Sequence, residues 1–144
     1  MATQIIPNLW LGNILDSRNS EFLKSIDIII NCSTNIPFYS KNTKNIRIKI
    51  EDNLEPKEID NMYKYLDSTS NFLHKNLLEN KSVFVHCYAG KQRSATIICA
   101  YLMKYLKMSY REVSDLMQTK RLIVFTPLPN FNKPLIEFQQ SIIT

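Results

Sequence analysis

Glycine is unusually scarce in this chain and occurs at only two positions, Gly12 and Gly90. Glycine permits positive backbone φ angles and close approach of other atoms to the backbone. Its scarcity excludes glycine-rich linkers, and the chain contains no internal repeat or low-complexity tract. We therefore expect a specific structural reason for each of the two glycines.

Cysteine is also scarce: Cys32, Cys87 and Cys99 are the only three, and none belongs to a CxxC pair. An odd number without paired spacing argues against a disulfide framework and against a structural zinc site. We therefore predict no bound metal, no cofactor and a reducing intracellular location, cytoplasmic or nuclear.

Long hydrophobic runs are missing as well. No apolar segment approaches the roughly 20 residues that cross a bilayer. The N-terminal sequence MATQIIP lacks the basic start and long apolar stretch of a signal peptide. We expect a protein that has no membrane span and is not exported.

The composition suits one compact domain over residues 1–144, because 44% of the residues are hydrophobic and 22% are charged. The formal net charge of +5 favours anionic partners through long-range attraction. This charge does not distinguish phosphorylated substrates from nucleic acid. The sequence gives no sign of an obligate nucleic acid, and it leaves the oligomeric state unknown.

β-Branched and alternating apolar residues predict four strands. Residues 5–11 suggest a short edge strand closed by Gly12, and residues 26–32 (IDIIINC) a central strand buried on both faces. Isoleucine alternates with basic residues over 46–50, which indicates a half-buried strand. Residues 82–85 form the fourth.

Apolar residues at intervals of three and four predict helices between and after these strands. Pro56 suits the start of the longest helix, and Ser109 and Glu112 have the spacing of a capping box. The expected helices cover residues 20–25, 57–78, 94–106, a segment from Ser109, and 135–142. Strands that alternate with helices imply an α/β fold with a central, mostly parallel sheet flanked by helices.

Residues 86–94, HCYAGKQRS, lie between a predicted strand and a predicted helix. Such a loop is suited to bind an anion, because its N–H groups and the positive end of the helix point to one place. Five residue types at these spacings rarely meet by chance in a chain this short: His86, Cys87, Gly90, Arg93 and Ser94.

Cys87 opens this loop, and a thiol at a helix N-terminus beside cations loses its proton readily. We therefore expect a nucleophilic thiolate at neutral pH. The planar fork of Arg93 can hold two phosphate oxygens, more tightly as the phosphoryl group becomes trigonal. Ser94, at the expected N-cap, can cap the helix or present its hydroxyl to the sulfur. We interpret His86 as a residue that holds the loop and helps keep Cys87 ionised.

Attack on phosphorus expels an oxygen that needs a proton. The acidic loop at 51–55 offers Glu51, Asp52 and Glu55 as donors. Taken by itself this loop is an ordinary solvated turn, and the residues alone do not select one donor.

The chain resembles the dual-specificity phosphatases of the protein tyrosine phosphatase superfamily along nearly its whole length. The segments that carry the resemblance are IIPNLWLGN at 5–13, IDIIINCS at 26–33, IEDN at 50–53, and HCYAGKQRSAT followed by AYLMKY from residue 86. The resemblance implies a single-domain protein tyrosine phosphatase-like fold. It also implies hydrolysis of phosphotyrosine and of phosphoserine or phosphothreonine in proteins, through a phosphocysteine intermediate.

By that resemblance Cys87 is the nucleophile, Arg93 the phosphate clamp, Asp52 the acid and then the base, and Ser94 the residue that eases breakdown of the phosphocysteine. The phosphate is expected against the loop residues Tyr88, Ala89, Gly90, Lys91, Gln92 and Arg93. Because the chain begins directly at the first strand, we expect a shallow site that admits phosphoserine and phosphothreonine.

One segment departs from the family pattern. The family usually has a Ser-Pro-Asn-Phe-like segment before its last helix, whereas this chain has TPLPNF at 126–131. Leu128 falls where the asparagine belongs, and Asn130 matches only with a two-residue shift, so a supporting role for Asn130 is left open. Substrate selection is expected to rest on surface features such as Arg121 or the basic stretch 41–49.

Other functions of the same loop stay open. Lys91 adds charge inside the loop, as in phosphoinositide phosphatases of the superfamily, and a basic surface would suit an RNA 5′-triphosphatase. A pseudophosphatase would bind phosphorylated partners without turnover, although such chains generally lack the nucleophile or the clamp. Reversible oxidation of Cys87 is a regulatory hypothesis, with the choice between Cys32 and Cys99 as its partner left open.

Overall fold

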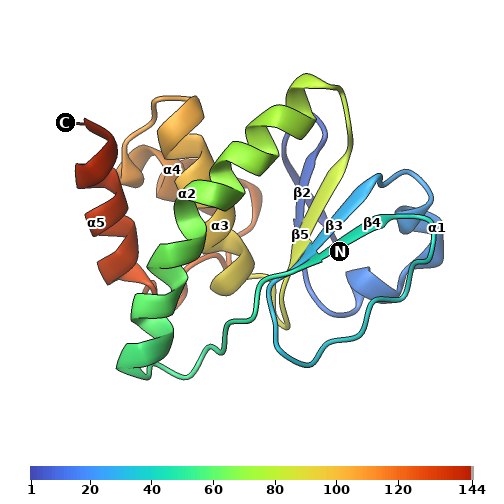
Figure 1. Cartoon of the computed structure of the whole chain (residues 1–144), viewed down its shortest axis with the longest axis horizontal. Coiled ribbons are helices and arrows are strands. Elements are labelled where there is room, and N and C mark those ends of the chain that lie inside the picture. Colours follow the sequence, from blue (N-terminus) through green and yellow to red (C-terminus); the bar gives the residue numbers. More distant parts are fainter. Residues whose placement is uncertain (144) are drawn as a thin grey trace.

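The computed structural model describes residues 1–143 and shows an α/β architecture around a five-stranded sheet with the order β1-β2-β5-β3-β4. The strands are β1 (Thr3–Ile6), β2 (Leu9–Gly12), β3 (Ile28–Asn31), β4 (Lys44–Arg47) and β5 (Val83–His86). The β1–β2 pair is antiparallel, and the other neighbours are parallel. The predicted fold class, a mostly parallel sheet flanked by helices, is confirmed (Figure 1).

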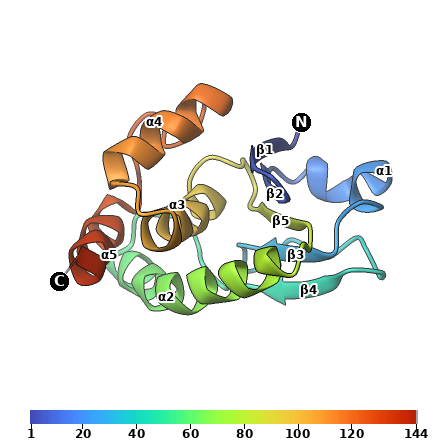
Figure 2. The same ribbon diagram turned by 90° about the horizontal axis from the view of Figure 1, so that it is seen from above.

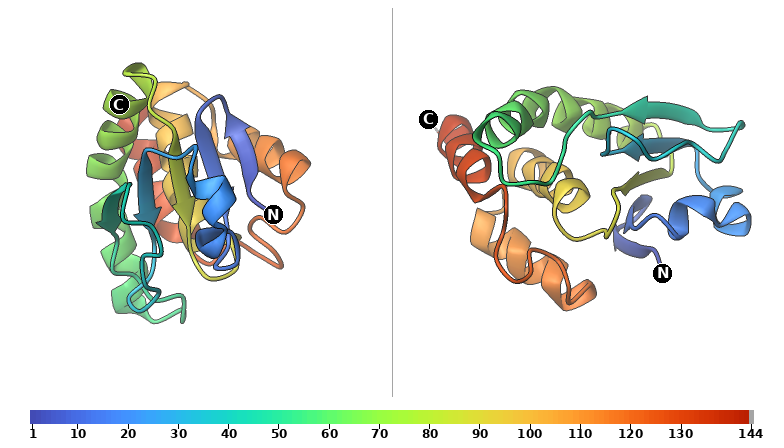
Figure 3. Two further views of the ribbon diagram at one scale, coloured as in Figure 1. Left: turned by 90° about the vertical axis from the view of Figure 1, so that its right-hand side faces the viewer. Right: turned by 90° about the horizontal axis from the view of Figure 1, so that it is seen from below.

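The helices cover both faces of the sheet unequally. The long helices α2–α5 lie on one side, and the short α1 lies on the other (Figures 2 and 3). Among the described residues, no helix is both long and apolar enough to cross a membrane. The helices are η1 (Asp16–Arg18), α1 (Ser20–Leu23), α2 (Pro56–Leu78), α3 (Arg93–Tyr105), α4 (Tyr110–Lys120) and α5 (Asn132–Ile143).

The strands β3 and β5 are buried along their whole length. One face of the sheet packs into the main core with α2 and α3, where Ile30 and Val85 are fully buried. The opposite face packs Ile29 and Phe84 against Leu23 of α1. Burial of each such side chain contributes about 1.5–3 kcal/mol. Cover on both faces explains why residues 26–32 form a nearly continuous apolar run.

The prediction of a single edge strand over residues 5–11 is wrong. The segment is a hairpin, in which β1 forms the edge and β2 pairs with β5 inside the sheet. Asn8 has a φ of 69° in the turn, a left-handed conformation that asparagine tolerates better than most residues. Pro7 also lies in this turn, between β1 and β2.

The alternating segment 46–50 is a strand only in its first half, because β4 ends at Arg47. The Ile48 N–H still donates to the Asn31 carbonyl at 2.9 Å, but β3 ends there. Ile48 and Ile50 continue as buried residues without a strand partner. Their alternation therefore reflects burial of one side of an extended chain, not a longer β-ladder.

Most predicted helices are confirmed. Helix α2 begins at Pro56, and the Ser109–Glu112 capping box opens α4. The last helix begins at Asn132, three residues earlier than predicted, because Pro134 is tolerated in a first helical turn. The residue before α3 is Gln92, so the prediction of Ser94 as N-cap is wrong.

Gly12 allows two elements to approach the end of β2. A Cβ atom on this residue would lie 2.6 Å from Asp16 Oδ2 and 2.7 Å from Cε1 of the buried Phe84 ring. We predict that Gly12→Ala lowers the free energy of unfolding by about 1–3 kcal/mol, because the overpacked ring must shift. Urea denaturation measures this. Gln4→Ala, at an exposed position of β1, is the control, and equal stability of the two variants would contradict the steric explanation.

Candidate active site

The segment 86–94 forms the turn from the central strand β5 into α3, at the carboxyl end of the parallel strands (Figure 1). This is the edge at which ligands bind in open α/β sheets. Neighbouring loops hold the turn from outside: the Ile14 N–H donates to the Tyr88 carbonyl at 3.0 Å, and the Phe125 N–H donates to the Lys91 carbonyl at 2.8 Å.

Cys87 and Ser94 face each other across this loop. Cys87 is 2% exposed, and its Sγ lies 3.1 Å from Ser94 Oγ. Since Ser94 lies in the first turn of α3 and does not cap it, its hydroxyl is directed to the sulfur. Of the two roles left open for Ser94, only the contact with Cys87 agrees with the geometry.

Arg93 reaches from the start of α3 to the acidic loop. Its Nη1 donates to the Ile50 carbonyl at 2.9 Å. Its Nε is buried and has no hydrogen-bond partner among the described residues. A guanidinium tethered at one end with an unsatisfied N–H is suited to a bound oxyanion.

Gly90 requires its left-handed backbone, with a φ of 66°. Its carbonyl accepts from Arg121 Nε at 2.9 Å, and a Cβ atom would meet the Gly12 carbonyl oxygen at 2.6 Å. Arg121 also donates to the Met1 carbonyl and to Thr3 Oγ1. Burial lowers the pKa of Arg121, although Asp16 and Cys87 oppose that shift. Arg121 therefore braces the loop and is not the free surface feature we expected.

The remaining loop side chains point in different directions. Tyr88 is 63% exposed, whereas Gln92 is 2% exposed. The Gln92 amide turns to the segment between α4 and α5, where Nε2 donates to the Thr126 and Leu128 carbonyls. Any contact of Gln92 with phosphate must come from its backbone.

The structure answers the question about Asn130. Asn130 Nδ2 donates to Asp52 Oδ1 at 2.8 Å, and the Asn130 N–H donates to Gln92 Oε1 at 2.9 Å. Leu128, which matches the family asparagine in sequence spacing, contributes only its carbonyl. Asn130, and not Leu128, is therefore the residue of this segment whose side chain contacts the acidic loop.

Asp52 is the carboxylate of the acidic loop that joins this network. The Glu51 carboxylate instead accepts from the Thr34 hydroxyl, and the Glu51 N–H donates to the Glu58 carboxylate. Glu55 is exposed at the start of α2. These contacts distinguish Asp52 from Glu51 and Glu55, whereas the residues of the loop alone did not.

His86 is 1% exposed, and burial lowers its pKa to about 4, although a hydrogen bond with the Cys87 backbone opposes this shift. Its Nδ1 is buried without a hydrogen-bond partner among the described residues. The imidazole is therefore neutral at neutral pH. It can orient the loop, but it supplies no positive charge that would keep Cys87 ionised.

The other two thiols differ in their relation to the site. The Cys32 N–H donates to the His86 carbonyl at 2.8 Å, and burial together with the charge of Cys87 raises the pKa of the Cys32 thiol, with Arg93 opposing. Burial alone raises the pKa of Cys99, within α3. Both are neutral buried thiols. Across residues 1–143, no cluster of three His, Cys, Asp or Glu side chains is arranged to hold a metal ion.

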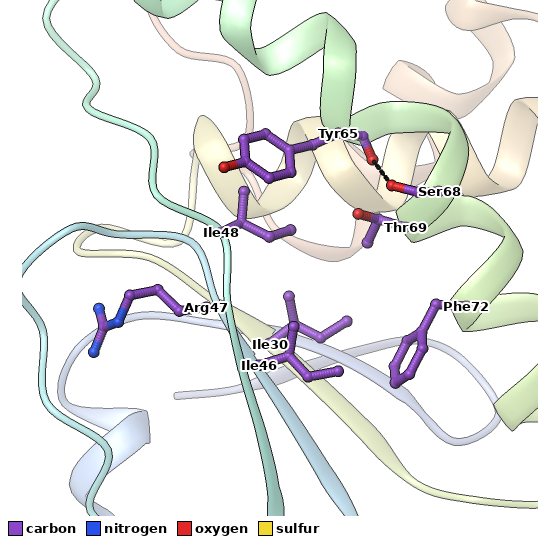
Figure 4. Close-up of a pocket in the computed structure, with 8 residues that line it drawn as sticks. All are labelled: Ile30, Ile46, Arg47, Ile48, Tyr65, Ser68, Thr69 and Phe72. Atoms are coloured by element: carbon purple, nitrogen blue, oxygen red, sulfur yellow. Dashed lines mark hydrogen bonds between the residues drawn. The ribbon is translucent and has the colours of Figure 1, made fainter.

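A separate apolar cavity of about 260 Å³ lies between β4 and α2 (Figure 4). Ile46, Tyr65 and Phe72 line it, and the Arg47 guanidinium points away from it. That guanidinium donates to the Ser33 and Ile36 carbonyls, so this member of the basic stretch 41–49 has a structural role. None of the cavity's lining residues belongs to the loop at 86–94, proposed below to bind phosphate and there called the phosphate loop, or to the acidic loop at 51–55.

A family model described as "Dual specificity phosphatase, catalytic domain" matches residues 9–141. The chain belongs to this family. It is thereby a member of the cysteine-dependent hydrolases, and the resemblance seen in the sequence is confirmed.

Relatives of this dual specificity phosphatase domain differ in length. Human Dual specificity protein phosphatase 9 is 35% identical over 144 residues, which cover 96% of this chain and 36% of the relative. Putative tyrosine phosphatase 123R of Invertebrate iridescent virus 6 is 33% identical over 139 residues, covering 96% of this chain and 92% of the relative. The chain thus spans about a third of the human relative and most of the viral one.

The solved structure of DUSP15 is similar to the phosphatase domain throughout. Its TM-score is 0.86 at 29% identity, and the match covers 97% of this chain and 88% of that one. The similarity therefore extends over the sheet, both helical layers and the loops around Cys87.

The buried His86 of the phosphatase domain makes stability depend on pH. Its folded pKa of about 4 lies below the ordinary 6.5, so the unfolded chain binds an extra proton between these values. The free energy of unfolding should fall by roughly 3 kcal/mol as pH drops through this window. His86→Asn, which cannot titrate, should show a shallower slope in urea denaturation at pH 7 and pH 4.5. An identical slope would contradict the neutral buried imidazole.

Proposed function

We propose that this chain is a protein phosphatase that hydrolyses phosphotyrosine and phosphoserine or phosphothreonine monoesters through a phosphocysteine intermediate. The observation that carries this proposal is the convergence of Cys87, Arg93 and Asp52 from two loops and a helix start. Cys87 has a hydroxyl partner 3.1 Å away, Arg93 has an unsatisfied buried N–H, and Asp52 is held in place by Asn130.

In the first step the Cys87 sulfur forms a bond to phosphorus while the bond from phosphorus to the leaving oxygen breaks. Arg93 and the loop N–H groups bind the equatorial oxygens, whose negative charge they stabilise. A proton passes from Asp52 to the leaving oxygen, so that an alcohol or phenol departs and Asp52 becomes a carboxylate.

In the second step a water oxygen attacks the phosphocysteine and the bond from phosphorus to sulfur breaks. Asp52 takes a proton from the water, and orthophosphate leaves. The Ser94 hydroxyl can donate a hydrogen bond to the departing thiolate, since the two atoms are already in contact. The cycle restores a protonated acid and a free thiolate.

Exposed apolar side chains around the loop support a polypeptide substrate. They occur on segments that hydrogen bonds tie to the phosphate loop or to its acid, and they would contact residues beside the phosphorylated one. With their exposed fractions they are Leu15 (68%), Leu54 (61%), Tyr88 (63%), Leu122 (82%) and Leu128 (74%). The name of the human relative, a dual specificity protein phosphatase, supports the same substrate class.

Lys91 is the observation that favours the second candidate, a phosphoinositide phosphatase or RNA 5′-triphosphatase. Binding of nucleic acid, however, relies on several basic contacts to phosphates. Arg121 and Arg47 are already engaged with carbonyl groups. A pseudophosphatase is the weakest alternative, because Cys87, Arg93 and Asp52 are all present.

Three unpaired, buried cysteines support a reducing compartment, cytoplasmic or nuclear.

The nucleophile gives the central test. We predict that Cys87→Ser lowers kcat for p-nitrophenyl phosphate at least about a thousandfold, because serine at this position lacks a ready anionic nucleophile. Steady-state kinetics measure the loss, and intact-protein mass spectrometry of rapidly quenched enzyme should detect a phosphate adduct in the wild type but not in Cys87→Ser. Cys99→Ser is the matched control. Full activity of Cys87→Ser would refute the mechanism.

The substrate class is tested by comparing release of phosphate from phosphopeptides, inositol phospholipids and triphosphate-ended RNA. We expect the highest kcat/KM on phosphopeptides, and Leu122→Ser should lower that value about threefold to tenfold through lost apolar contact. The control Leu78→Ser alters another largely exposed leucine, at the end of α2. Preference for the lipid or the RNA would overturn the protein-substrate proposal.

A further inference from the structure

The Gln92 amide lies inside a ring of backbone partners. Its Nε2 donates to the Thr126 carbonyl at 3.1 Å and to the Leu128 carbonyl at 2.9 Å, and its Oε1 accepts from the Asn130 N–H at 2.9 Å. The opposite amide orientation would set the oxygen against two carbonyls, so these partners fix which way it points. Every hydrogen of the amide is used.

The segment 126–130 depends on an outside partner for its shape. Pro127 and Pro129 have no N–H, so the segment cannot build a ladder of its own. The carbonyls that precede these prolines are the two that Gln92 binds. Partly buried backbone groups need such partners, and a single side chain of the phosphate loop provides them.

The same segment delivers Asn130 to the acid. The Asn130 N–H is held by Gln92 Oε1, and its Nδ2 donates to Asp52 Oδ1. In a protonated carboxyl the carbonyl oxygen is the stronger hydrogen-bond acceptor, so the contact with Asn130 favours the acid proton on Oδ2, the oxygen that would face the leaving group.

We propose that Gln92 is a positioning residue for the general acid, acting on Asp52 through Asn130. The proposal rests on the proposed function, since it assigns Asp52 the acid role. According to the proposal, the Gln92 side chain sets the distance between the phosphate loop, which binds the phosphate, and Asp52, which protonates the leaving oxygen. A displaced acid lowers turnover without weakening phosphate binding.

The first experiment compares leaving groups. Phenyl phosphate expels a basic phenoxide that needs a proton, whereas dinitrophenyl phosphate expels a stable anion. We expect Gln92→Ala to lower kcat about tenfold on phenyl phosphate and less than about threefold on dinitrophenyl phosphate. KM should change less than about twofold, because the loop N–H groups and Arg93 are retained.

The second experiment combines variants. In an Asp52→Ala background, Gln92→Ala should lower kcat on phenyl phosphate by less than about twofold further, because the residue it positions is gone. Asn130→Ala should reproduce the leaving-group pattern of Gln92→Ala, and the double variant of Gln92 and Asn130 should be no worse than either alone.

Gln118→Ala is the matched control. Gln118 Nε2 also donates to a carbonyl of the α4–α5 connection, that of Val124, at 2.9 Å, but it does not touch Asn130. This variant should keep the wild-type ratio of rates on the two substrates. Gln92→Met preserves the side-chain length in case Gln92→Ala fails to fold, and thermal unfolding verifies that each variant is folded.

Equal losses on both substrates, or a full further loss in the Asp52→Ala background, would assign Gln92 to the phosphate loop itself and overturn the proposal. An unchanged kcat for Gln92→Ala and Gln92→Met would overturn it as well. These failures differ from failure of the proposed function, in which the folded wild type would release no phosphate from either aryl phosphate.

Discussion

The turn from β5 into α3 imposes the constraint on which the rest of the site depends. A loop that directs its N–H groups toward an anion directs its carbonyls outward, where they need donors. Three of these carbonyls accept hydrogen bonds from three different parts of the chain. The Tyr88 carbonyl accepts from the loop after β2, the Gly90 carbonyl from the Arg121 side chain, and the Lys91 carbonyl from the α4–α5 connection. The outer loops therefore complete the backbone hydrogen bonding of the turn.

The proposed catalytic groups share these supports. Arg93 ties the start of α3 to Ile50, directly before the acidic loop. Asn130 ties the α4–α5 connection to Asp52, and Gln92 ties that connection back to the turn. The proposed acid, clamp and nucleophile are thus parts of one hydrogen-bonded unit. Such a unit explains how a small domain can hold reacting groups from distant parts of the chain in fixed geometry.

Local sequence patterns correctly predicted those helices and strands whose formation does not depend on contacts with distant segments. The apolar run before Cys32, the periodic face of α2 and the Ser109 capping box each gave the correct element. Two of the errors occurred where the chain turns or where a strand loses its partner. Asn8 turns one apolar segment into a hairpin, and the end of β3 stops β4 at Arg47 although alternation continues.

By itself the sequence determined the loop and the residues proposed as its nucleophile and clamp, because these residues lie within one short segment and their spacing in the sequence fixes how they are arranged. Tertiary structure decided everything that joins separate segments. Asp52 is distinguished from Glu51 by its contact with Asn130, and Gln92 matters through partners more than thirty residues away. The neutrality of His86 follows from burial, which no local pattern reveals. Contacts between distant segments depend on how the folded chain brings those segments together, and the spacing of residues within one segment does not encode this arrangement.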